Sequence, residues 1–178
     1  MIHKAVFIDR DGVICQNRDD YVKSWGEFEF VWKSLEAIVR LSSSDYLIVI
    51  VTNQSAIGRG IVSADVVDDI NTRMTGEIIK AGGRVDRVIV CPHTPDDNCA
   101  CRKPKPGMLL SAANEMDIDL SQSYMVGDSV DDMLAGIAAG CIPIIVLTGR
   151  GIHEWMNRRD LTFKVVSNLW KSVDYIVS

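Results

Sequence analysis

The chain has 178 residues, of which 47% are hydrophobic and 24% are charged, a globular composition that excludes disordered and low-complexity classes. At roughly 150 residues per domain, this length predicts a single domain over residues 1–178. The net charge of −5 argues against a nucleic-acid partner, because a phosphate backbone requires clustered basic side chains, but it permits a small phosphorylated substrate.

Short apolar runs alternate with longer amphipathic stretches along the chain. The apolar runs predict strands at residues 5–8, 47–51, 88–90, 124–126, 144–146 and 164–166. The amphipathic stretches predict helices within or near residues 35–42, 63–82, 108–116, 131–139 and 169–175. Strands that are apolar throughout are covered on both faces. We therefore expect an α/β fold, a Rossmann-like three-layer sandwich with a central, mainly parallel sheet.

The apolar runs are all short. The longest, residues 46–51 and 142–147, fall far below the ~20 residues of a membrane-spanning helix, and the run at residues 5–8 is too short for a secretory signal. Clustered cysteines in such a chain indicate metal ligands before disulfides. We therefore expect a cytoplasmic monomer with no membrane partner.

Residues 91–106 interrupt the alternation of strands and helices. The segment holds four of the five prolines and few apolar residues, so we expect a long irregular loop, a kind that is usually functional or disordered. It carries three thiols and one imidazole, a donor set that Zn²⁺ binds tetrahedrally in structural sites: Cys91, His93, Cys99 and Cys101. Their one-residue spacings are shorter than in zinc fingers, so free surface thiols remain the alternative.

Polar residues follow three of the predicted strands. Asp9 and Asp11 come after the first strand, residues 52–55 after the second, and Asp128 and Asp132 after the fourth. Ligands bind outside the carboxyl ends of the strands in open α/β sheets, so we expect these side chains at one edge of the sheet. Alone, the DxDG pattern could be a solvated turn, but three such strand ends make that reading weak.

Carboxylates gathered at one edge cannot all stay ionised without a partner. Mg²⁺ is the best-fitting partner, because it prefers oxygen ligands, keeps several waters and binds substrate phosphate. Asp9 can then act as a nucleophile that forms an aspartyl-phosphate, and Asp11 can protonate the leaving alkoxide and later activate water. Thr52 and Asn53 can donate hydrogen bonds to the phosphoryl group, which also needs a lysine.

Four segments resemble the ordered motifs of the haloacid dehalogenase superfamily of phosphatases. They are FIDRDG at residues 7–12, TNQ at 52–54, RKP at 102–104 and GDSVDD at 127–132. The resemblance covers the chain from about residue 4 to residue 150. It implies the superfamily's fold and a phosphoric monoester hydrolase.

The resemblance also implies roles for single residues. Asp9 corresponds to the nucleophile and Asp11 to the general acid/base, while Thr52 (with Asn53) and Lys103 correspond to the residues that hold the phosphoryl group.

The implied Mg²⁺ ligands are Asp9, the backbone carbonyl of Asp11, and Asp128. Asp132 corresponds to a residue that orients this shell.

The loop at residues 91–108 is similar to the zinc loop of a subfamily that contains heptose 1,7-bisphosphate 7-phosphatases and histidinol-phosphate phosphatases. Residues 52–60 (TNQSAIGRG) resemble the heptose version, which ends in Arg-Gly. The chain departs from it at Ala56, where Gly is frequent, at Ser129, where some members have a basic residue, and in a slightly longer loop at residues 17–24. These departures concern sugar specificity rather than the chemistry.

The gaps between the motifs are too short for a lid domain, so we expect a capless enzyme whose site is fenced by loops. A zinc-stapled loop would aim Lys103 at the transferring phosphate and Arg102 at a second anionic or polyhydroxyl portion of the substrate. The residues expected to bind substrate are Asn17, Arg18, Asp20, Tyr21, Asn53, Gln54, Ser55, Arg59 and Arg102.

The favoured hypothesis is therefore a Mg²⁺-dependent sugar bisphosphate phosphatase with a structural zinc. The resemblance implies removal of the C7 phosphate of D-glycero-D-manno-heptose 1,7-bisphosphate, in nucleotide-activated heptose biosynthesis. The alternatives are a histidinol-phosphate phosphatase and a non-catalytic metal-binding protein with a phosphatase fold. The second is disfavoured because every motif residue is intact.

Overall fold

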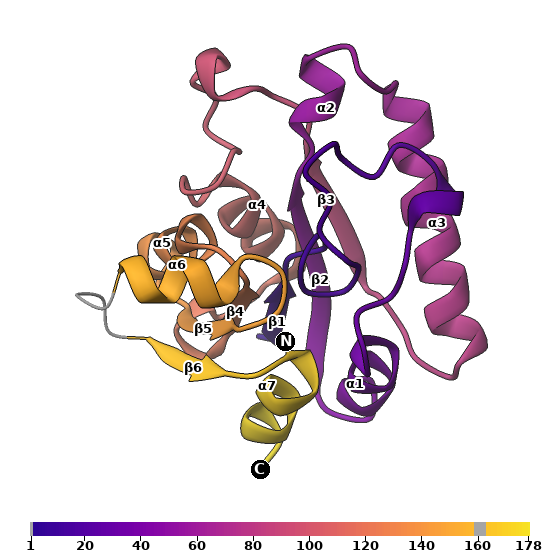
Figure 1. The fold of residues 1–178 in the computed structure, drawn as a ribbon. Helices are drawn as coiled ribbons and strands as arrows, with labels where there is room; N and C mark the ends of the chain where they lie inside the picture. The colour runs from indigo at the N-terminus through magenta and orange to yellow at the C-terminus, as the bar shows by residue number, and fades with distance from the viewer. Residues whose placement is uncertain (1, 159–162) are drawn as a thin grey trace.

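The computed structural model describes residues 2–158 and 163–178, and a six-stranded sheet forms its centre (Figure 1). All neighbouring strands are parallel, in the order β3-β2-β1-β4-β5-β6. The strands are β1 (Lys4–Ile8), β2 (Tyr46–Asn53), β3 (Arg87–Cys91), β4 (Tyr124–Gly127), β5 (Ile142–Val146) and β6 (Lys164–Val166). The predicted α/β fold and the six predicted strands are confirmed.

Helices cover both faces of this sheet. They are α1 (Ser34–Leu41), α2 (Ser55–Gly58), α3 (Ala64–Lys80), α4 (Gly107–Met116), α5 (Val130–Ala139), α6 (Gly151–Asn157) and α7 (Leu169–Ile176). The five predicted helices are present, whereas α2 and α6 were not expected. Both are short, with four and seven residues, and neither offers the repeated apolar spacing from which a helix is predicted.

The three layers follow from the alternation of side chains along each strand. In β1, Val6 and Ile8 pack with α1, α3 and α7, whereas Ala5 and Phe7 pack with α4 and α5 on the opposite face. All four side chains are fully buried. This double coverage explains why β1 is apolar at four successive positions rather than at every second one.

Local signals set the ends of the helices near the site. The Ser63 side chain accepts a hydrogen bond from the backbone N–H of Val66 and begins α3, and Gly140 ends α5 in the left-handed conformation with φ of 90°, as expected for such caps. At the start of α5, Ser129 and Asp132 form a reciprocal capping box. This capping box fixes an acidic side chain at the carboxyl edge of the sheet.

The sheet order brings the predicted site residues together. β1 lies between β2 and β4, so their carboxyl ends are adjacent at the point where the strand order reverses, the usual ligand site of such sheets. In the described part of the chain, the β1–β2 connection holds one short 3₁₀ turn and α1, and the β2–β3 connection holds α2 and α3. The expected capless architecture is therefore observed there.

No helix among the described residues combines the length and the apolar character that a membrane crossing requires.

Candidate active site

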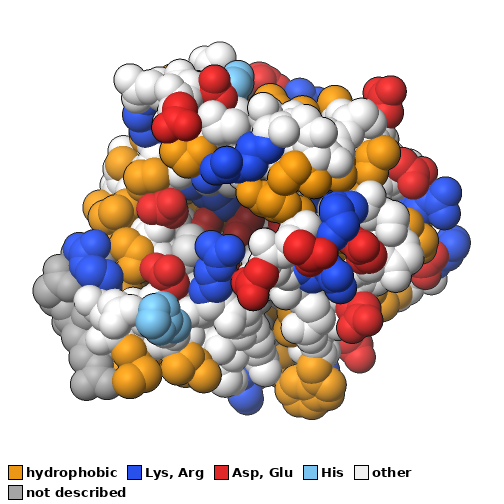
Figure 2. Space-filling view, turned by 45° about the horizontal axis from the view of Figure 1, so that its top comes forward, with side chains coloured by type: hydrophobic (Ala, Val, Ile, Leu, Met, Phe, Trp, Pro, Cys, Tyr) orange, Lys and Arg blue, Asp and Glu red, His pale blue; other side chains and the backbone are white. Residues whose placement is uncertain are grey.

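A cavity of about 380 Å³ opens at the carboxyl ends of β1, β2 and β4. Figure 2 shows this hollow with acidic side chains on its floor and lysine and arginine side chains at its edge. Apart from the four predicted zinc ligands and Asp20, the predicted site residues all line it: Asp9, Asp11, Asn17, Arg18, Tyr21, Thr52, Asn53, Gln54, Ser55, Arg59, Arg102, Lys103, Asp128 and Asp132.

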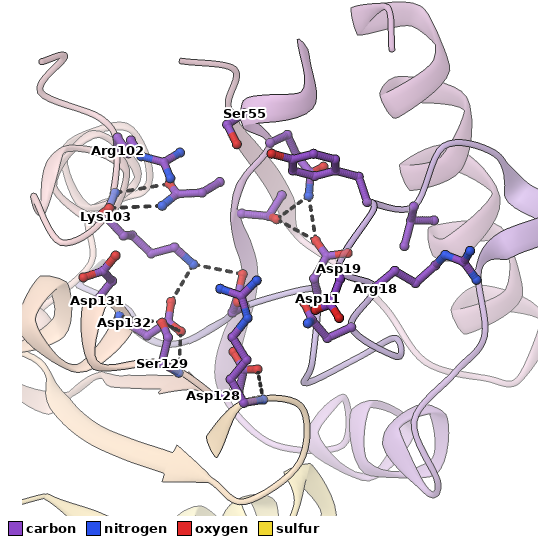
Figure 3. Close-up of a pocket in the computed structure, with 18 of the residues that line it drawn as sticks. Asp11, Arg18, Asp19, Ser55, Arg102, Lys103, Asp128, Ser129, Asp131 and Asp132 are labelled. Atoms are coloured by element: carbon purple, nitrogen blue, oxygen red, sulfur yellow. Dashed lines mark hydrogen bonds and ion pairs between the residues drawn. The ribbon is translucent and has the colours of Figure 1, made fainter. Parts of the chain in front are cut away.

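Lys103 is the central cation of the cavity floor. Its side chain is 2% exposed, and its Nζ lies 2.9 Å from Asp9 Oδ1 and 2.6 Å from Asp132 Oδ1. The same Nζ donates to the carbonyl of Val51 at 2.9 Å. In Figure 3 the Lys103 side chain extends from its loop toward Asp132. The ammonium is thus fixed beside the predicted nucleophile.

Asn53 anchors the segment that carries this lysine. Its Nδ2 donates to the carbonyl of Lys103 at 3.1 Å, and its Oδ1 accepts from the backbone N–H of Lys103 at 3.2 Å. Because both amide atoms are engaged by the backbone, Asn53 ties the end of β2 to the loop after β3. This pairing places the predicted phosphate-binding lysine.

Asp128 is held by a loop that the sequence did not point to. Its Oδ2 accepts from the backbone N–H of Arg150 at 2.8 Å. A Cβ at Gly12 would lie 2.0 Å from this oxygen, and one at Gly149 would lie 2.1 Å from it. Both glycines have positive φ, +86° and +54°, so any side chain at either position would displace the carboxylate.

The buried acids share an electrostatic conflict. Burial, opposed by Lys103 and reinforced by Asp132 and Asp11, raises the pKa of Asp9 to about 7. Burial and the neighbouring Asp9 raise the pKa of Asp128 to about 8. Burial alone would lower the pKa of Lys103, but Asp132 and Asp9 raise it above its ordinary value. One cation does not balance three carboxylates.

A divalent cation suits this arrangement. Oxygen atoms of Asp9, Asp128 and Asp132 all lie within 4.8 Å of one another, and hard cations such as Mg²⁺ take carboxylate oxygens. Asp132 is already engaged, since its Oδ2 accepts from the backbone N–H of Ser129 at 3.1 Å while its Oδ1 faces Lys103. Asp9 and Asp128 are therefore the best-placed carboxylate ligands, with Asp132 as their support.

Asp11 lies on the other side of the cavity (Figure 3). Its Oδ2 accepts from Gln54 Nε2 at 2.6 Å and from Thr52 Oγ1 at 3.4 Å. Gln54 Nε2 also donates to Thr52 Oγ1 at 2.9 Å. Thr52 in β2 and Gln54, which directly follows β2, thus hold the predicted general acid/base on this side of the cavity.

The four predicted zinc ligands form one cluster. The Sγ–Sγ distances are 3.7 Å for Cys91–Cys99, 3.2 Å for Cys91–Cys101 and 3.4 Å for Cys99–Cys101. His93 Nδ1 lies 3.7 Å from Cys91 Sγ and 3.3 Å from Cys101 Sγ. Zn–S bonds of about 2.3 Å predict sulfur separations of roughly 3.8 Å around a tetrahedral ion. These distances suit a shared metal, whereas a disulfide requires about 2.05 Å.

Arg102 connects this cluster to the cavity. Its Nη1 donates to the carbonyl of His93 at 3.1 Å, while the residue also lines the cavity. Lys105, a second lysine two residues further along this loop, instead donates to the Asn98 carbonyl at 3.0 Å on the exposed side of the loop. The structure therefore favours Lys103 as the lysine of the site.

The loop at residues 17–24, called the flap below, is divided between the cavity and the surface. Asp20 does not line the cavity, although Asp19 does. The Asp20 side chain is 62% exposed and pairs with Arg18 and Lys23. Asp20 therefore lies where it can shape the flap rather than contact a bound molecule directly.

Sequence reasoning missed several residues of the site. The cavity is also lined by Asp19, Val22, Ser129, Asp131, Arg150 and Glu154. In addition, the buried Arg10 forms an ion pair with Asp11. Arg150 and Glu154 follow β5, so the strand-end argument applied to the fifth strand could have found them.

Comparisons with known proteins bear on this site. The HAD-hydrolase-like family (haloacid dehalogenase) matches residues 100–172. A Pseudomonas aeruginosa protein named D-glycero-beta-D-manno-heptose-1,7-bisphosphate 7-phosphatase is 41% identical over 153 residues, which is 86% of each chain. A Bordetella bronchiseptica protein of the same name is 44% identical over 148 residues, 83% of each chain. The chain belongs to this family of haloacid dehalogenase-like phosphatases.

A solved structure of the family has nearly the same fold as this chain. It is the D,D-heptose 1,7-bisphosphate phosphatase of B. bronchiseptica complexed with magnesium and phosphate, with a TM-score of 0.94, 39% identity and 98% of both chains covered. The predicted superfamily and the predicted class of phosphoric monoester hydrolase are thereby confirmed.

Proposed function

We propose that this chain removes the C7 phosphate of D-glycero-β-D-manno-heptose 1,7-bisphosphate through an aspartyl-phosphate. The observation that carries the proposal is the buried Asp9–Lys103–Asp132 arrangement beside Asp128. It offers a nucleophile, a cation and metal ligands on one cavity floor, in a chain whose relatives are named for this reaction.

In the first half-reaction, an Asp9 oxygen attacks the phosphorus of the C7 phosphate. The bond from phosphorus to the C7 oxygen breaks, and Asp11 gives its proton to the departing alkoxide. Lys103 Nζ, 2.9 Å from Asp9, and the Thr52 hydroxyl offset the charge on the transferring phosphoryl group.

In the second half-reaction, Asp11 takes a proton from water, and the resulting hydroxide attacks the phosphorus of the aspartyl-phosphate. The bond from phosphorus to the Asp9 oxygen breaks, which releases inorganic phosphate and restores both carboxyl groups. The position of Asp11 at the cavity wall, within reach of Thr52 and Gln54, supports its use in both steps.

We assign the Mg²⁺ ligands to Asp9, the backbone carbonyl of Asp11, and Asp128, with Asp132 holding Lys103 in place. When bound, Mg²⁺ supplies positive charge to the phosphoryl oxygens. The raised pKa values of Asp9 and Asp128, about 7 and about 8, support this assignment, because a bound cation offsets both the burial of the charges and the repulsion between carboxylates that raise them.

We assign Zn²⁺ to the cluster of Cys91, His93, Cys99 and Cys101. Four protein ligands leave no open position, so the ion is structural. Such thiolates persist in a reducing compartment, which supports a cytoplasmic location. The site residues lie within a single chain, so we further propose that the monomer is the active unit.

Recognition of the sugar and of its second phosphate falls to the loops around the cavity. Arg102 and Arg59 supply positive charge at its edge, and guanidinium groups bind phosphate in a bidentate manner. The other proposed contacts come from the flap and from the segment after β2: Asn17, Arg18, Tyr21, Gln54 and Ser55.

A phosphate-release panel tests the proposal. The purified protein with Mg²⁺ is given both anomers of the heptose bisphosphate, histidinol phosphate and simple sugar monophosphates, with Asp9→Asn as the inactive control. We expect the β-anomer of the bisphosphate to have a kcat/KM at least about 100-fold above that of any monophosphate, because a second charge-assisted contact contributes roughly 2–3 kcal/mol. Preference for histidinol phosphate would instead establish the alternative activity.

A further inference from the structure

Arg10 is a fully buried arginine between two residues of the catalytic motif. Its side chain is 0% exposed, and arginine almost never loses all contact with water unless it is paired. Its Nε donates to Asp11 Oδ2 at 3.1 Å, and its Nη2 donates to Asp11 Oδ1 at 3.1 Å. The guanidinium thus holds both oxygens of the neighbouring carboxylate.

We propose that Arg10 is a positioning residue for the general acid/base: its buried guanidinium holds both Asp11 oxygens and so fixes the direction in which that carboxyl group faces. The inference rests on the proposed function only in treating Asp11 as the acid and base of a phosphatase. It does not depend on which phosphate ester is the natural substrate.

A second contact fixes the guanidinium itself. Arg10 Nη1 donates to Asn71 Oδ1 at 3.0 Å, and Asn71 is a buried residue of α3. The guanidinium is therefore held from α3 on one side while it holds Asp11 on the other. Because the guanidinium is a planar fork and Asn71 fixes its orientation, it also fixes the orientation of the Asp11 carboxylate. A flexible ammonium group could not do this.

The backbone explains how two consecutive residues can face each other. The carbonyl of Arg10 accepts from the backbone N–H groups of Ile14 at 2.8 Å and Cys15 at 3.0 Å, so the chain turns tightly after β1 instead of continuing as a strand. Any residue at position 10 could supply that carbonyl. The burial of a charged side chain there calls for a separate reason, and the bidentate pair with Asp11 supplies one.

The Arg10–Asp11 pair also restrains Asp11, which acts in both half-reactions of the proposed mechanism. Asp11 is 23% exposed and reaches the cavity, where Gln54 and Thr52 donate to the same Oδ2 that Arg10 Nε contacts. Without the fork, the carboxyl group could rotate about its side chain and lose its alignment with the leaving oxygen. A displacement of about 1 Å at such a group can cost on the order of 100-fold in rate.

Leaving-group dependence tests this role. Benzyl phosphate releases an alkoxide that needs a proton from Asp11, whereas 4-nitrophenyl phosphate releases a stable phenolate that does not. kcat/KM reports the steps up to release of this group, so the ratio of kcat/KM for the two esters isolates the acid step. It also cancels any inactive protein, because both esters are hydrolysed by the same active fraction.

In Arg10→Met we expect kcat/KM to fall about 100-fold more for benzyl phosphate than for 4-nitrophenyl phosphate. Arg10→Lys, which keeps the charge but loses the fork, should lie between wild type and Arg10→Met. If Arg10→Met does not fold, the ratio of kcat/KM measured for Arg10→Lys tests the proposal instead. A ratio within threefold of wild type in the folded variants would overturn the proposal.

Arg84→Met is the matched control. Arg84 is a partly buried arginine that also pairs with a nearby carboxylate, since its Nε lies 3.3 Å from Asp86 Oδ2. Its guanidinium further donates to backbone carbonyls of Ser44 at 3.4 Å and Tyr46 at 2.6 Å, at the opposite edge of the sheet from Asp11. We expect this variant to lose stability and to keep the wild-type ratio. A shifted ratio in the control would show that general destabilisation mimics the effect and would also overturn the proposal. Wild-type activity on the heptose bisphosphate is measured separately, so failure of the substrate assignment leaves this test intact.

Discussion

Two clusters of candidate metal ligands in this protein are built in opposite ways. Asp9 and Asp128 stand at the ends of neighbouring strands and are buried, so the sheet itself determines where they lie. The four thiol and imidazole ligands come from one loop, residues 91–101, whose regular structure beyond the end of β3 is a single 3₁₀ turn. In the first cluster the fold places the ligands, whereas in the second the ligands determine the path of the chain.

This difference predicts different consequences of losing each metal. The strand ends keep their hydrogen bonds without a cation, so the first site should lose chemistry and retain its fold. The loop buries few apolar side chains, and there the free energy of metal binding is folding free energy. The residues 102–103 join the two clusters, because Arg102 contacts the His93 carbonyl and Lys103 contacts Asp9.

The largest effect should come from Asp9→Asn, which breaks the first cluster only. Removal of the nucleophile should lower turnover by roughly 10⁴-fold or more, as for other enzymes that lose a nucleophile. The zinc content and the melting temperature should stay close to wild type, because Asn has nearly the same shape. Mass spectrometry should detect an aspartyl-phosphate on Asp9 in the wild type during turnover, and turnover within tenfold of wild type in the variant would exclude Asp9 from this role.

Breaking the second cluster should affect both activity and fold. Cys101→Ser removes a ligand next to Arg102, so we expect less than one bound zinc per chain by elemental analysis, a lower melting temperature and a turnover decreased by about 10³-fold as Lys103 loses its position. Serine at Cys141, which lies outside the cluster, is the control for thiol loss. Full activity of a zinc-free Cys101→Ser protein would contradict the structural role of the metal.

Arg102→Ala tests the link between the two clusters. If Arg102 binds the remote phosphate, its loss should cost roughly 2–4 kcal/mol in transition-state binding of the bisphosphate, or about 30- to 1000-fold in kcat/KM. Hydrolysis of 4-nitrophenyl phosphate, which lacks the remote group, should change little. Lys103→Ala is the comparison, because it touches the transferring phosphoryl group and should depress both substrates alike. Equal losses for both substrates in Arg102→Ala would place Arg102 in the phosphoryl site.

The same contrast explains what the sequence could predict. Each strand-end acid follows an apolar run, so the alternating pattern both locates the strands and marks Asp9 and Asp128 as neighbours at one edge. The loop ligands at residues 91–101 were recognisable by residue type alone. In both clusters, the residue types and their positions along the chain were sufficient to identify the candidate ligands.

What sequence could not predict depends on contacts between distant segments. Gly12, in the turn after β1, and Gly149, in the loop after β5, both lie close to Asp128. No periodic pattern of apolar residues predicts a contact between such distant segments. Nothing in the sequence marks Arg10 as fully buried, because arginine side chains are mostly exposed in proteins. Flap residues have no strand or helix period, so nothing in the sequence distinguished Asp19, which lines the cavity, from Asp20, which does not.

The smallest expected effect is a pH dependence that belongs to the acid cluster alone. Burial and neighbouring carboxylates raise the pKa of Asp9 to about 7 and that of Asp128 to about 8, both from 3.8. Between about pH 4 and pH 8 the folded state therefore holds protons that the unfolded chain releases. Since stability falls with pH wherever the folded state binds more protons, this contribution is present at low pH and lost as the pH rises through 7 to 8.

Without added Mg²⁺, the melting temperature of the zinc-loaded protein should therefore fall by several degrees between pH 5.5 and pH 8.5, as expected for one to two kcal/mol in a chain of this size. Mg²⁺ binds the ionised carboxylates, so its stabilisation should be larger at pH 8.5 than at pH 5.5. Titration of the zinc ligands could alter the same curve, so Asp128→Asn, which leaves residues 91–101 intact, supplies the reference. The difference between wild type and this variant isolates the acid cluster, and a difference that is flat across the range would contradict the raised pKa of Asp128.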